Sequence, residues 1–263
     1  MRVYATAARL SFRRYMSYRS SFIAGAFTNT VFGFIRAAIL LALWSQKPEI
    51  AGYDAADAVT YTFLTQALIT PLALFSGTTE LSQRIRTGDV AVDLYRPCDL
   101  QGWFLAGDAG RAGASLVLRT LPPVVAGALV YRLSLPAAPL IWLEFAASVL
   151  VALLISFAIR YLVSVSAFWT LDERGAASML AVVAMFCSGM IVPLGIMPGR
   201  LSSLCYALPW SSMLQVPINI LLGAQPGGFG PAFGIQLLWA AALLGLGRLC
   251  TAAARHKVVV QGG

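Results

Sequence analysis

The sequence has little charge for its length. Charged residues make up 11% of its 263 residues, whereas apolar residues make up 59%. An ordinary globular domain carries about 25% charged residues, so a water-soluble chain of this composition could not cover its surface. Long uncharged runs and a mean hydropathy of +0.76 instead indicate a polytopic membrane protein.

Residues that carry chemistry are also scarce. The single histidine, His256, lies in a basic tail, and the four cysteines are far apart without a C-x-x-C spacing. This pattern argues against a metal or redox site and against a membrane-embedded enzyme, which needs such residues clustered. The sequence also lacks a G-x-x-x-x-G-K-[ST] phosphate loop, so we expect no ATP hydrolysis by this chain.

Six apolar segments predict an all-α membrane protein with one transmembrane domain over residues 1–263 and six transmembrane helices. The segments cover approximately residues 22–44, 59–75, 114–131, 139–169, 176–192 and 233–251. The fourth would be ~46 Å long as a helix, which exceeds the ~30 Å hydrocarbon core of a bilayer. We therefore expect it to project into the cytoplasm.

The distribution of positive charge predicts the orientation. With the N-terminus inside, the inner segments hold 13 Lys and Arg residues, and the outer segments hold only Lys47, Arg132 and Arg200. Short loops rich in Lys and Arg remain on the cytoplasmic side. Both termini should therefore be cytoplasmic, and the net charge of +8 reflects membrane topology rather than a nucleic-acid partner.

The segment over residues 1–20 is predicted to be an amphipathic interfacial helix. Arg2, Arg9 and Arg13 share one face of the helix, while Val3 and Tyr4 are among the apolar and aromatic residues of the other face. Such a helix lies on the inner leaflet and binds anionic lipid. The alternative is a basic tail that only enforces the orientation.

The longest cytoplasmic segment covers residues 77–113 and is rich in both signs of charge. Glu80 and Arg84 are spaced for an i,i+4 pair in a short helix, and Gly88 is a plausible stop for it. Residues 90–95 could form a second helical turn, which Pro97 would end. A mixed-charge helix with an apolar stripe suits docking into a groove on a partner; the alternative is a solvated loop.

A broken segment over residues 193–230 follows the fifth predicted span. It stays largely apolar, but Pro209 and Pro217 divide its central part into pieces of about 8 residues, which are too short to cross the core. We expect a re-entrant or interfacial hairpin on the outer side, shielded by protein.

These motifs, in this order, resemble the membrane permease of type-2 ABC exporters, in particular a bacterial subfamily of them. The resemblance extends over essentially the whole chain. It is carried by Arg86-Thr87-Gly88-Asp89 and Leu94-Tyr95-Arg96-Pro97 between spans two and three, and by Ser188-Gly189, Val192-Pro193, Met197-Pro198 and Leu208-Pro209 after span five.

The resemblance implies an exporter in the bacterial cytoplasmic membrane. Two permease subunits, identical or homologous, would pair above two separately encoded ATPase subunits, which would bind the ATP and Mg²⁺. The cargo would be a small amphipathic or drug-like compound. Residues 77–113 would form the coupling element that enters a cleft on the ATPase, with the candidate residues Glu80, Arg84, Arg86, Gly88, Asp89, Asp93 and Arg96.

Charged residues within the predicted spans need a reason, because each costs roughly 2.5–3.5 kcal/mol at the bilayer centre. Arg36 and Glu144 fall at a similar depth below the outer surface, so we predict that they pair within one subunit or across two. The alternative for Arg36 is snorkelling to outer headgroups. Arg119 and Arg160 lie near the inner ends of their spans, where snorkelling would explain them.

Small residues follow one face of the first span at every fourth position, at Gly25, Asn29, Gly33 and Ala37. Such a stripe allows close helix approach. It could serve packing inside the subunit, packing between subunits, or the lining of a pathway. In the third span, Pro122-Pro123 should produce a kink.

One other transport mechanism stays open at this point. A gradient-driven secondary transporter would use an intramembrane carboxylate to carry its ion, and Glu144 is the one candidate. That interpretation explains neither the charged segment at residues 77–113 nor the broken segment at residues 193–230.

Overall fold

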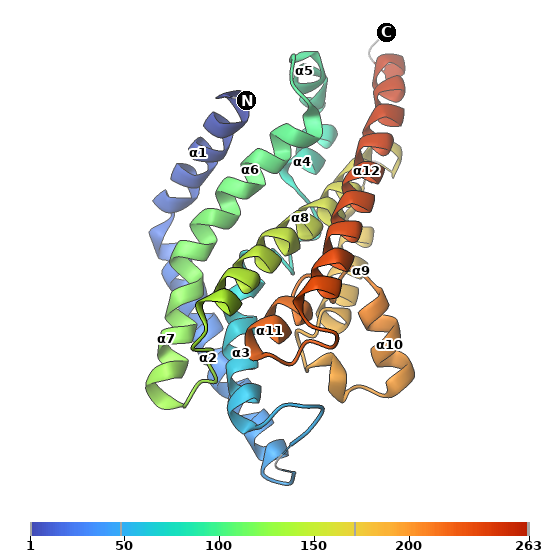
Figure 1. Cartoon of the computed structure of the whole chain (residues 1–263). Helices are drawn as coiled ribbons and strands as arrows, with labels where there is room; N and C mark the ends of the chain where they lie inside the picture. Colours follow the sequence, from blue (N-terminus) through green and yellow to red (C-terminus); the bar gives the residue numbers. More distant parts are fainter. Residues whose placement is uncertain (1, 48, 171, 262–263) are drawn as a thin grey trace.

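The computed structural model describes residues 2–47, 49–170 and 172–261 (Figure 1). In this part of the chain the only pairing of the β type is one isolated bridge between Ile50 and Tyr53, and the all-α class is confirmed. The helices are α1 (Arg2–Ser17), α2 (Arg19–Trp44), α3 (Ala55–Ile69), α4 (Glu80–Thr87), α5 (Val90–Tyr95), α6 (Leu100–Ser115), the π-helix η1 (Leu116–Thr120), α7 (Leu121–Val130), α8 (Pro139–Thr170), α9 (Arg174–Cys187), the 3₁₀ turn η2 (Leu194–Ile196), α10 (Gly199–Ala207), α11 (Gln215–Leu222) and α12 (Phe229–Gln261).

Four of the described helices are long and apolar enough to cross a membrane. They are α2, the continuous helix Leu100–Val130 made by α6, η1 and α7, α8, and the part of α12 over Phe229–Ala254. They correspond to the first, third, fourth and sixth predicted spans. The two ends of the chain lie at the same end of the molecule (Figure 1), and so does α5. The side chains of Arg255, His256 and Lys257 lie outside the described set.

The second and fifth predicted spans are shorter than expected. Helix α3 has 15 residues and α9 has 14, so each is only ~22 Å long against a core of ~30 Å. The structure therefore does not confirm six full crossings. Pro71 follows α3 and has no N–H to continue the helix, and Gly189 after α9 has φ +82°, a left-handed conformation that favours glycine.

The third predicted span begins 14 residues earlier than expected. Asp99 caps the helix by accepting a hydrogen bond of 2.6 Å from the N–H of Gly102, so residues 100–113 are helix rather than loop. The π-helix η1 directly precedes Pro122-Pro123. These prolines have no N–H and cannot donate to the carbonyls four residues earlier. The helix continues past these missing hydrogen bonds by forming the wider turn of η1.

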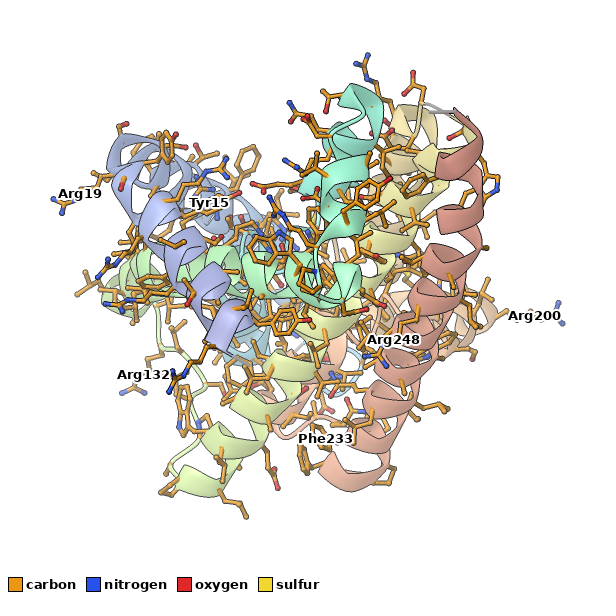
Figure 2. The ribbon with its side chains drawn as sticks, turned by 90° about the horizontal axis from the view of Figure 1, so that it is seen from above. Tyr15, Arg19, Arg132, Arg200, Phe233 and Arg248 are labelled. Carbon is orange, nitrogen blue, oxygen red and sulfur yellow. The ribbon has the colours of Figure 1, made fainter. Side chains whose placement is uncertain are left out.

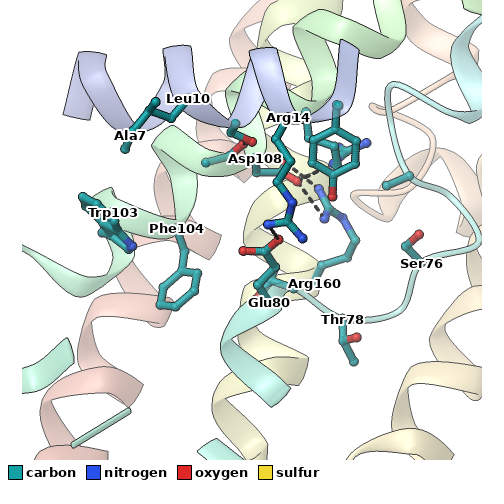
Figure 3. Close-up of a pocket in the computed structure, with 16 residues that line it drawn as sticks. Ala7, Leu10, Arg14, Ser76, Thr78, Glu80, Trp103, Phe104, Asp108 and Arg160 are labelled. Carbon is teal, nitrogen blue, oxygen red and sulfur yellow. Dashed lines mark hydrogen bonds and ion pairs between the residues drawn. The ribbon is translucent and has the colours of Figure 1, made fainter. Parts of the chain in front are cut away.

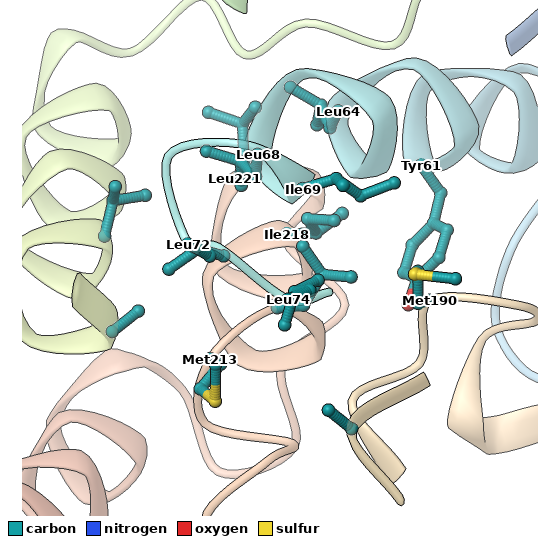
Figure 4. Close-up of a cluster of buried hydrophobic side chains, with 14 of the residues drawn as sticks. Tyr61, Leu64, Leu68, Ile69, Leu72, Leu74, Met190, Met213, Ile218 and Leu221 are labelled. Atoms are coloured by element: carbon teal, nitrogen blue, oxygen red, sulfur yellow. The ribbon is translucent and has the colours of Figure 1, made fainter. Parts of the chain in front are cut away.

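The core of the molecule lies where α3, α8 and α11 meet (Figure 4). Tyr61, Leu68, Leu72 and Ile218 are there with at most 2% exposure. Close helix approach also depends on small residues. A Cβ on Gly33 of α2 would come within 2.8 Å of the Phe63 ring, and one on Gly127 of α7 within 2.6 Å, so α2 and α7 both pack directly against that ring.

The segment at residues 193–230 contains the short helices η2, α10 and α11. Pro209 lies between α10 and α11, whereas Pro217 lies inside the first turn of α11. A buried polar network attaches the segment to the rest of the protein. Gln215 donates to the Tyr53 hydroxyl at 2.9 Å and accepts from the N–H of Leu194 at 2.9 Å, so its buried amide is hydrogen-bonded by protein groups.

Candidate functional site

Helices α4 and α5 form a hairpin at the end of the molecule that carries both chain termini (Figure 1). As predicted, α4 ends at Gly88, which has φ +81°, and α5 ends before Pro97. The predicted pair between Glu80 and Arg84 does not form. Instead, Arg84 donates to Asp93 of α5, and Glu80 forms an ion pair with Arg14 of α1.

The carboxylate of Asp93 holds the hairpin together. Asp93 is buried and lies between two guanidinium groups, that of Arg84 and that of Arg96, the latter at 3.3 Å. Its hydrogen bond raises the pKa of Arg84 above the ordinary value. A buried carboxylate needs such partners to offset its lost hydration, which explains why Arg84 binds Asp93 rather than the exposed Glu80.

The tip of the hairpin is exposed and partly apolar. Tyr95 is 91% exposed and Val92 is 59% exposed, and Arg86 in the last turn of α4 and Asp89 just before α5 are exposed as well. Exposed aromatic side chains on a rigid element are typical of contact surfaces between proteins. We call Val92, Tyr95, Arg86 and Asp89 the tip surface.

Glu173, in the connection between α8 and α9, fixes the position of α4. Its carboxylate is buried, accepts a hydrogen bond from Ser82, and lies 4.0 Å from Nη1 of Arg86. The backbone N–H of Thr79 also donates to Ser164 of α8 at 2.7 Å. Helix α4 is therefore attached to the membrane-crossing part of the chain by two separate contacts. Sequence reasoning did not identify Glu173, because its partners lie about 90 positions away.

The N-terminal segment forms the helix α1, which packs along α6; its position at the membrane surface stays a prediction. A Cβ on Gly110 would collide with the Ala8 carbonyl, and Ser11 donates to the Gly107 carbonyl at 2.6 Å. Arg14, the residue that departs from the amphipathic pattern of α1, pairs with Glu80 at 2.9 Å. The first helix is thereby connected to the hairpin as well as to α6.

A cavity of about 520 Å³ lies between α1, α6, α8 and the segment before α4 (Figure 3). Its wall contains the buried pair of Arg160 and Asp108, whose atoms lie 2.7 and 3.1 Å apart, and Arg111 joins Asp108 at 2.7 Å. The prediction that Arg160 snorkels is wrong, because its side chain is 7% exposed and its charge is compensated inside the protein.

Arg36 does not pair with Glu144 within the described chain. Its guanidinium donates to the carbonyls of Met190 and Ile191, which the end of α9 and Gly189 leave free. These carbonyls replace the expected carboxylate as acceptors. A pair between Arg36 of one subunit and Glu144 of another stays a prediction.

The small-residue stripe of α2 faces neighbours of the same chain. Asn29 donates to the Gln66 carbonyl at 3.1 Å, Gly33 contacts Phe63, and Gly25 lies against the guanidinium of Arg119. Arg119 in turn donates to the Ser21 carbonyl at 2.8 Å and lies over the Phe22 ring. The snorkelling prediction for Arg119 is therefore replaced by a set of contacts with α2.

The arrangement offers binding surfaces rather than reactive groups. In the parts of the chain that the structure describes, no cluster of three His, Cys, Asp or Glu residues could hold a metal ion. A protein-family model described as ABC-2 family transporter protein matches residues 28–260. No curated protein matches the chain.

Proposed function

The chain belongs to the ABC-2 family of transporter membrane proteins, and from this membership we propose that it is the permease subunit of an ATP-driven exporter. It is the membrane component of an ABC transporter and not the ATPase. Two such permeases, identical or homologous, would assemble with two separately encoded ATPase subunits in a bacterial cytoplasmic membrane. Both termini and the α4–α5 hairpin would be cytoplasmic.

The tip surface is the observation that carries the proposal. Tyr95 and Val92 are exposed on a hairpin whose shape is fixed by the buried Asp93. A rigid element with an exposed aromatic side chain and flanking charges suits the cleft of a partner protein. We propose that the ATPase receives the tip surface in such a cleft.

Three contacts could transmit a displacement of the hairpin. Ser82 binds Glu173 between α8 and α9, Thr79 binds Ser164 of α8, and Glu80 binds Arg14 of α1. When the ATPases close on ATP, the hairpin would move, and the attached helices would follow because these contacts connect them directly. The coupling is mechanical and requires no chemistry in the permease.

An apolar cavity beside α2 supports a small amphipathic cargo. It has a volume of about 520 Å³, and its wall contains Phe32, Ile35 and Met190 together with the polar Asn29 and Arg36. A mainly apolar pocket with a few polar groups is typical of small-molecule sites. We propose that this cavity lies on the path between the two permeases and is exposed alternately to each side.

Disruption of the tip surface tests the proposal. We expect the exchange of both Val92 and Tyr95 for Asp to abolish copurification with the ATPase and to reduce permease-stimulated ATP hydrolysis at least tenfold. The matched control is Val92→Thr with Tyr95→Phe, which keeps size and should keep coupling. Full stimulation by the Asp variant would refute the proposal, as would cargo transport by the purified permease without any ATPase.

A further inference from the structure

Another hollow, of about 500 Å³, lies where α1 meets α2, and we call it the junction pocket. It shares Tyr15, Ala73, Ser76 and Arg111 with the cavity of Figure 3. Most of its polar wall consists of hydroxyl groups, contributed by Tyr15, Tyr18, Ser21, Thr70, Ser76 and Ser115. Hydroxyl groups and guanidinium groups together are the donors that phosphate oxygens bind.

The charge around the junction pocket is not balanced. Among the described residues, its wall contains Arg111 and Arg119 and no Asp or Glu. The Asp108 carboxylate forms ion pairs with both Arg111 and Arg160. No described carboxylate lies within ion-pair distance of Arg119. Three guanidinium groups and one carboxylate leave two positive charges in excess. Such an excess at a partly buried site favours an anion.

The two arginines converge on one residue. Arg111 donates to the Thr70 carbonyl at 3.1 Å, and Arg119 donates to the Thr70 hydroxyl at 3.3 Å. Residues eight positions apart in a regular α-helix would point about 80° apart around the axis. The wider turn of η1, which begins after Arg111 and includes Arg119, reduces this angle. The Nε atom of Arg119 is buried and has no hydrogen-bond partner among the described residues, so one donor of this guanidinium is unsatisfied.

The position of the junction pocket suits a lipid headgroup. Ser21 and Phe22 belong to the first turn of α2, directly after the amphipathic α1, and the rings of Tyr18 and Phe75 are 61% and 60% exposed. On the proposed orientation, on which this inference rests, that level is the inner membrane surface. Aromatic rings prefer this level, and basic pockets between helices there bind anionic headgroups.

We propose that the junction pocket binds a phosphate group, for which an anionic phospholipid of the inner leaflet is the expected source. The guanidinium of Arg119 and the hydroxyls around it bind the phosphate oxygens, and the ligand compensates the excess positive charge. An occupied pocket connects α1, α2 and the end of α3, so the lipid stabilises the contact between the amphipathic helix and the first span.

Binding to the purified full-length chain in neutral detergent tests the inference. The probes are phosphatidylglycerol, phosphatidylcholine and inorganic phosphate, with native mass spectrometry for the lipids and the unfolding midpoint for all three. We expect phosphatidylglycerol to bind and to raise the midpoint, since a ligand of the folded state stabilises it. The loss of a charge-assisted hydrogen bond in Arg119→Gln should weaken this binding about tenfold or more.

Matched variants separate the pocket from general charge effects. Arg248→Gln removes the same charge from an exposed position on α12, well apart from Tyr15 in Figure 2, and should bind normally. Ser76 is exposed and its side chain makes no hydrogen bond with the described residues. Ser76→Glu should therefore fold but repel the phosphate, whereas Ser76→Gln should bind. If Arg119→Gln does not fold, the two Ser76 variants decide.

The outcomes are distinct. Phosphatidylglycerol binding that falls only in Arg119→Gln and Ser76→Glu supports the lipid, and the same pattern with inorganic phosphate assigns a free phosphate instead. Equal binding by all variants, or equal binding of phosphatidylcholine, would overturn the inference. The assay contains no ATPase, so a permease that couples normally but lacks the lipid response contradicts this inference and leaves the proposed function standing.

Discussion

The guanidinium of Arg160 on α8 binds both carboxylate oxygens of Asp108 on α6, at 3.1 and 2.7 Å. The two residues are 52 positions apart in the sequence, and both are largely buried. Two parallel hydrogen bonds fix the relative orientation of the groups as well as their separation. The pair therefore sets how α6 lies against α8 beside the cavity of Figure 3.

Loss of the Asp108 carboxylate should strongly destabilise the protein. Asp108→Asn leaves Arg160 and Arg111 without their shared partner, and removal of one partner from a buried pair costs about 3–5 kcal/mol. Arg160→Gln should cost less, because Arg111 still compensates Asp108. Chemical denaturation in detergent measures both values. Asp172→Asn is the control, since that carboxylate is 65% exposed. If Asp172→Asn lowered the free energy of unfolding as much as Asp108→Asn does, the prediction would be contradicted.

Asp93 should be needed for coupling more than for folding of the membrane-crossing helices. In Asp93→Asn the attraction between the hairpin and its two arginines is lost, so the tip surface becomes less rigid. We expect permease-stimulated ATP hydrolysis to fall about fivefold or more, a change of roughly 1 kcal/mol. Asp89→Asn, which alters an exposed carboxylate of the tip surface, should have a smaller effect on hydrolysis. Equal effects of the two substitutions would show that rigidity is not the cause.

Gly189→Ala should be far more destabilising than Gly223→Ala. Both glycines have positive φ angles, +82° and +69°, so an alanine at either position costs about 1–2 kcal/mol in the backbone. At Gly223 a Cβ meets no described atom within 4 Å, whereas at Gly189 it would collide with the Gln215 amide and the Tyr61 hydroxyl. The difference between the two variants in the free energy of unfolding therefore measures the effect of this collision. Equal decreases in the two variants would contradict the prediction.

Transport should depend on ATP and not on an ion gradient carried by Glu144. Glu144 is half-buried, and no described residue forms an ion pair with it. In vesicles that contain the permease and its ATPase, collapse of the proton and sodium gradients with ionophores should leave the flux unchanged in the wild type and in Glu144→Gln. A wild-type flux that stops on collapse, together with a Glu144→Gln flux that is already absent, would favour the secondary transporter.

Local features were predictable from the sequence because their causes are local. Gly88 and Pro97 end α4 and α5 through their own backbone chemistry, and the apolar periodicity of residues 1–20 suffices to identify α1. The ends of α3 and α9 were not predictable from hydropathy. Hydropathy reports whether a segment tolerates lipid, and the residues after Ile69 and Cys187 remain apolar although the chain turns there.

Charge partners were harder to predict than helices. The spacing of Glu80 and Arg84 suggested a pair, but each bound a different residue, because a buried carboxylate attracts a nearby arginine more strongly than an exposed one does. Glu173 and Asp108 gained their partners through helix packing over long sequence distances. A sequence pattern gives the spacing of charges along one helix. It does not show which face of a neighbouring helix packs against that helix.

The π-helix η1 amounts to one additional residue within the helix Leu100–Val130. Its consequence is a difference in phase between the two halves of that helix. If one residue of η1 were deleted, Leu100–Val130 would be a regular α-helix throughout. The side chains after the deletion would then rotate by about 100° around the helix axis. Gly127 would then no longer face the Phe63 ring. The one additional residue in η1 therefore determines how α7 packs against α3.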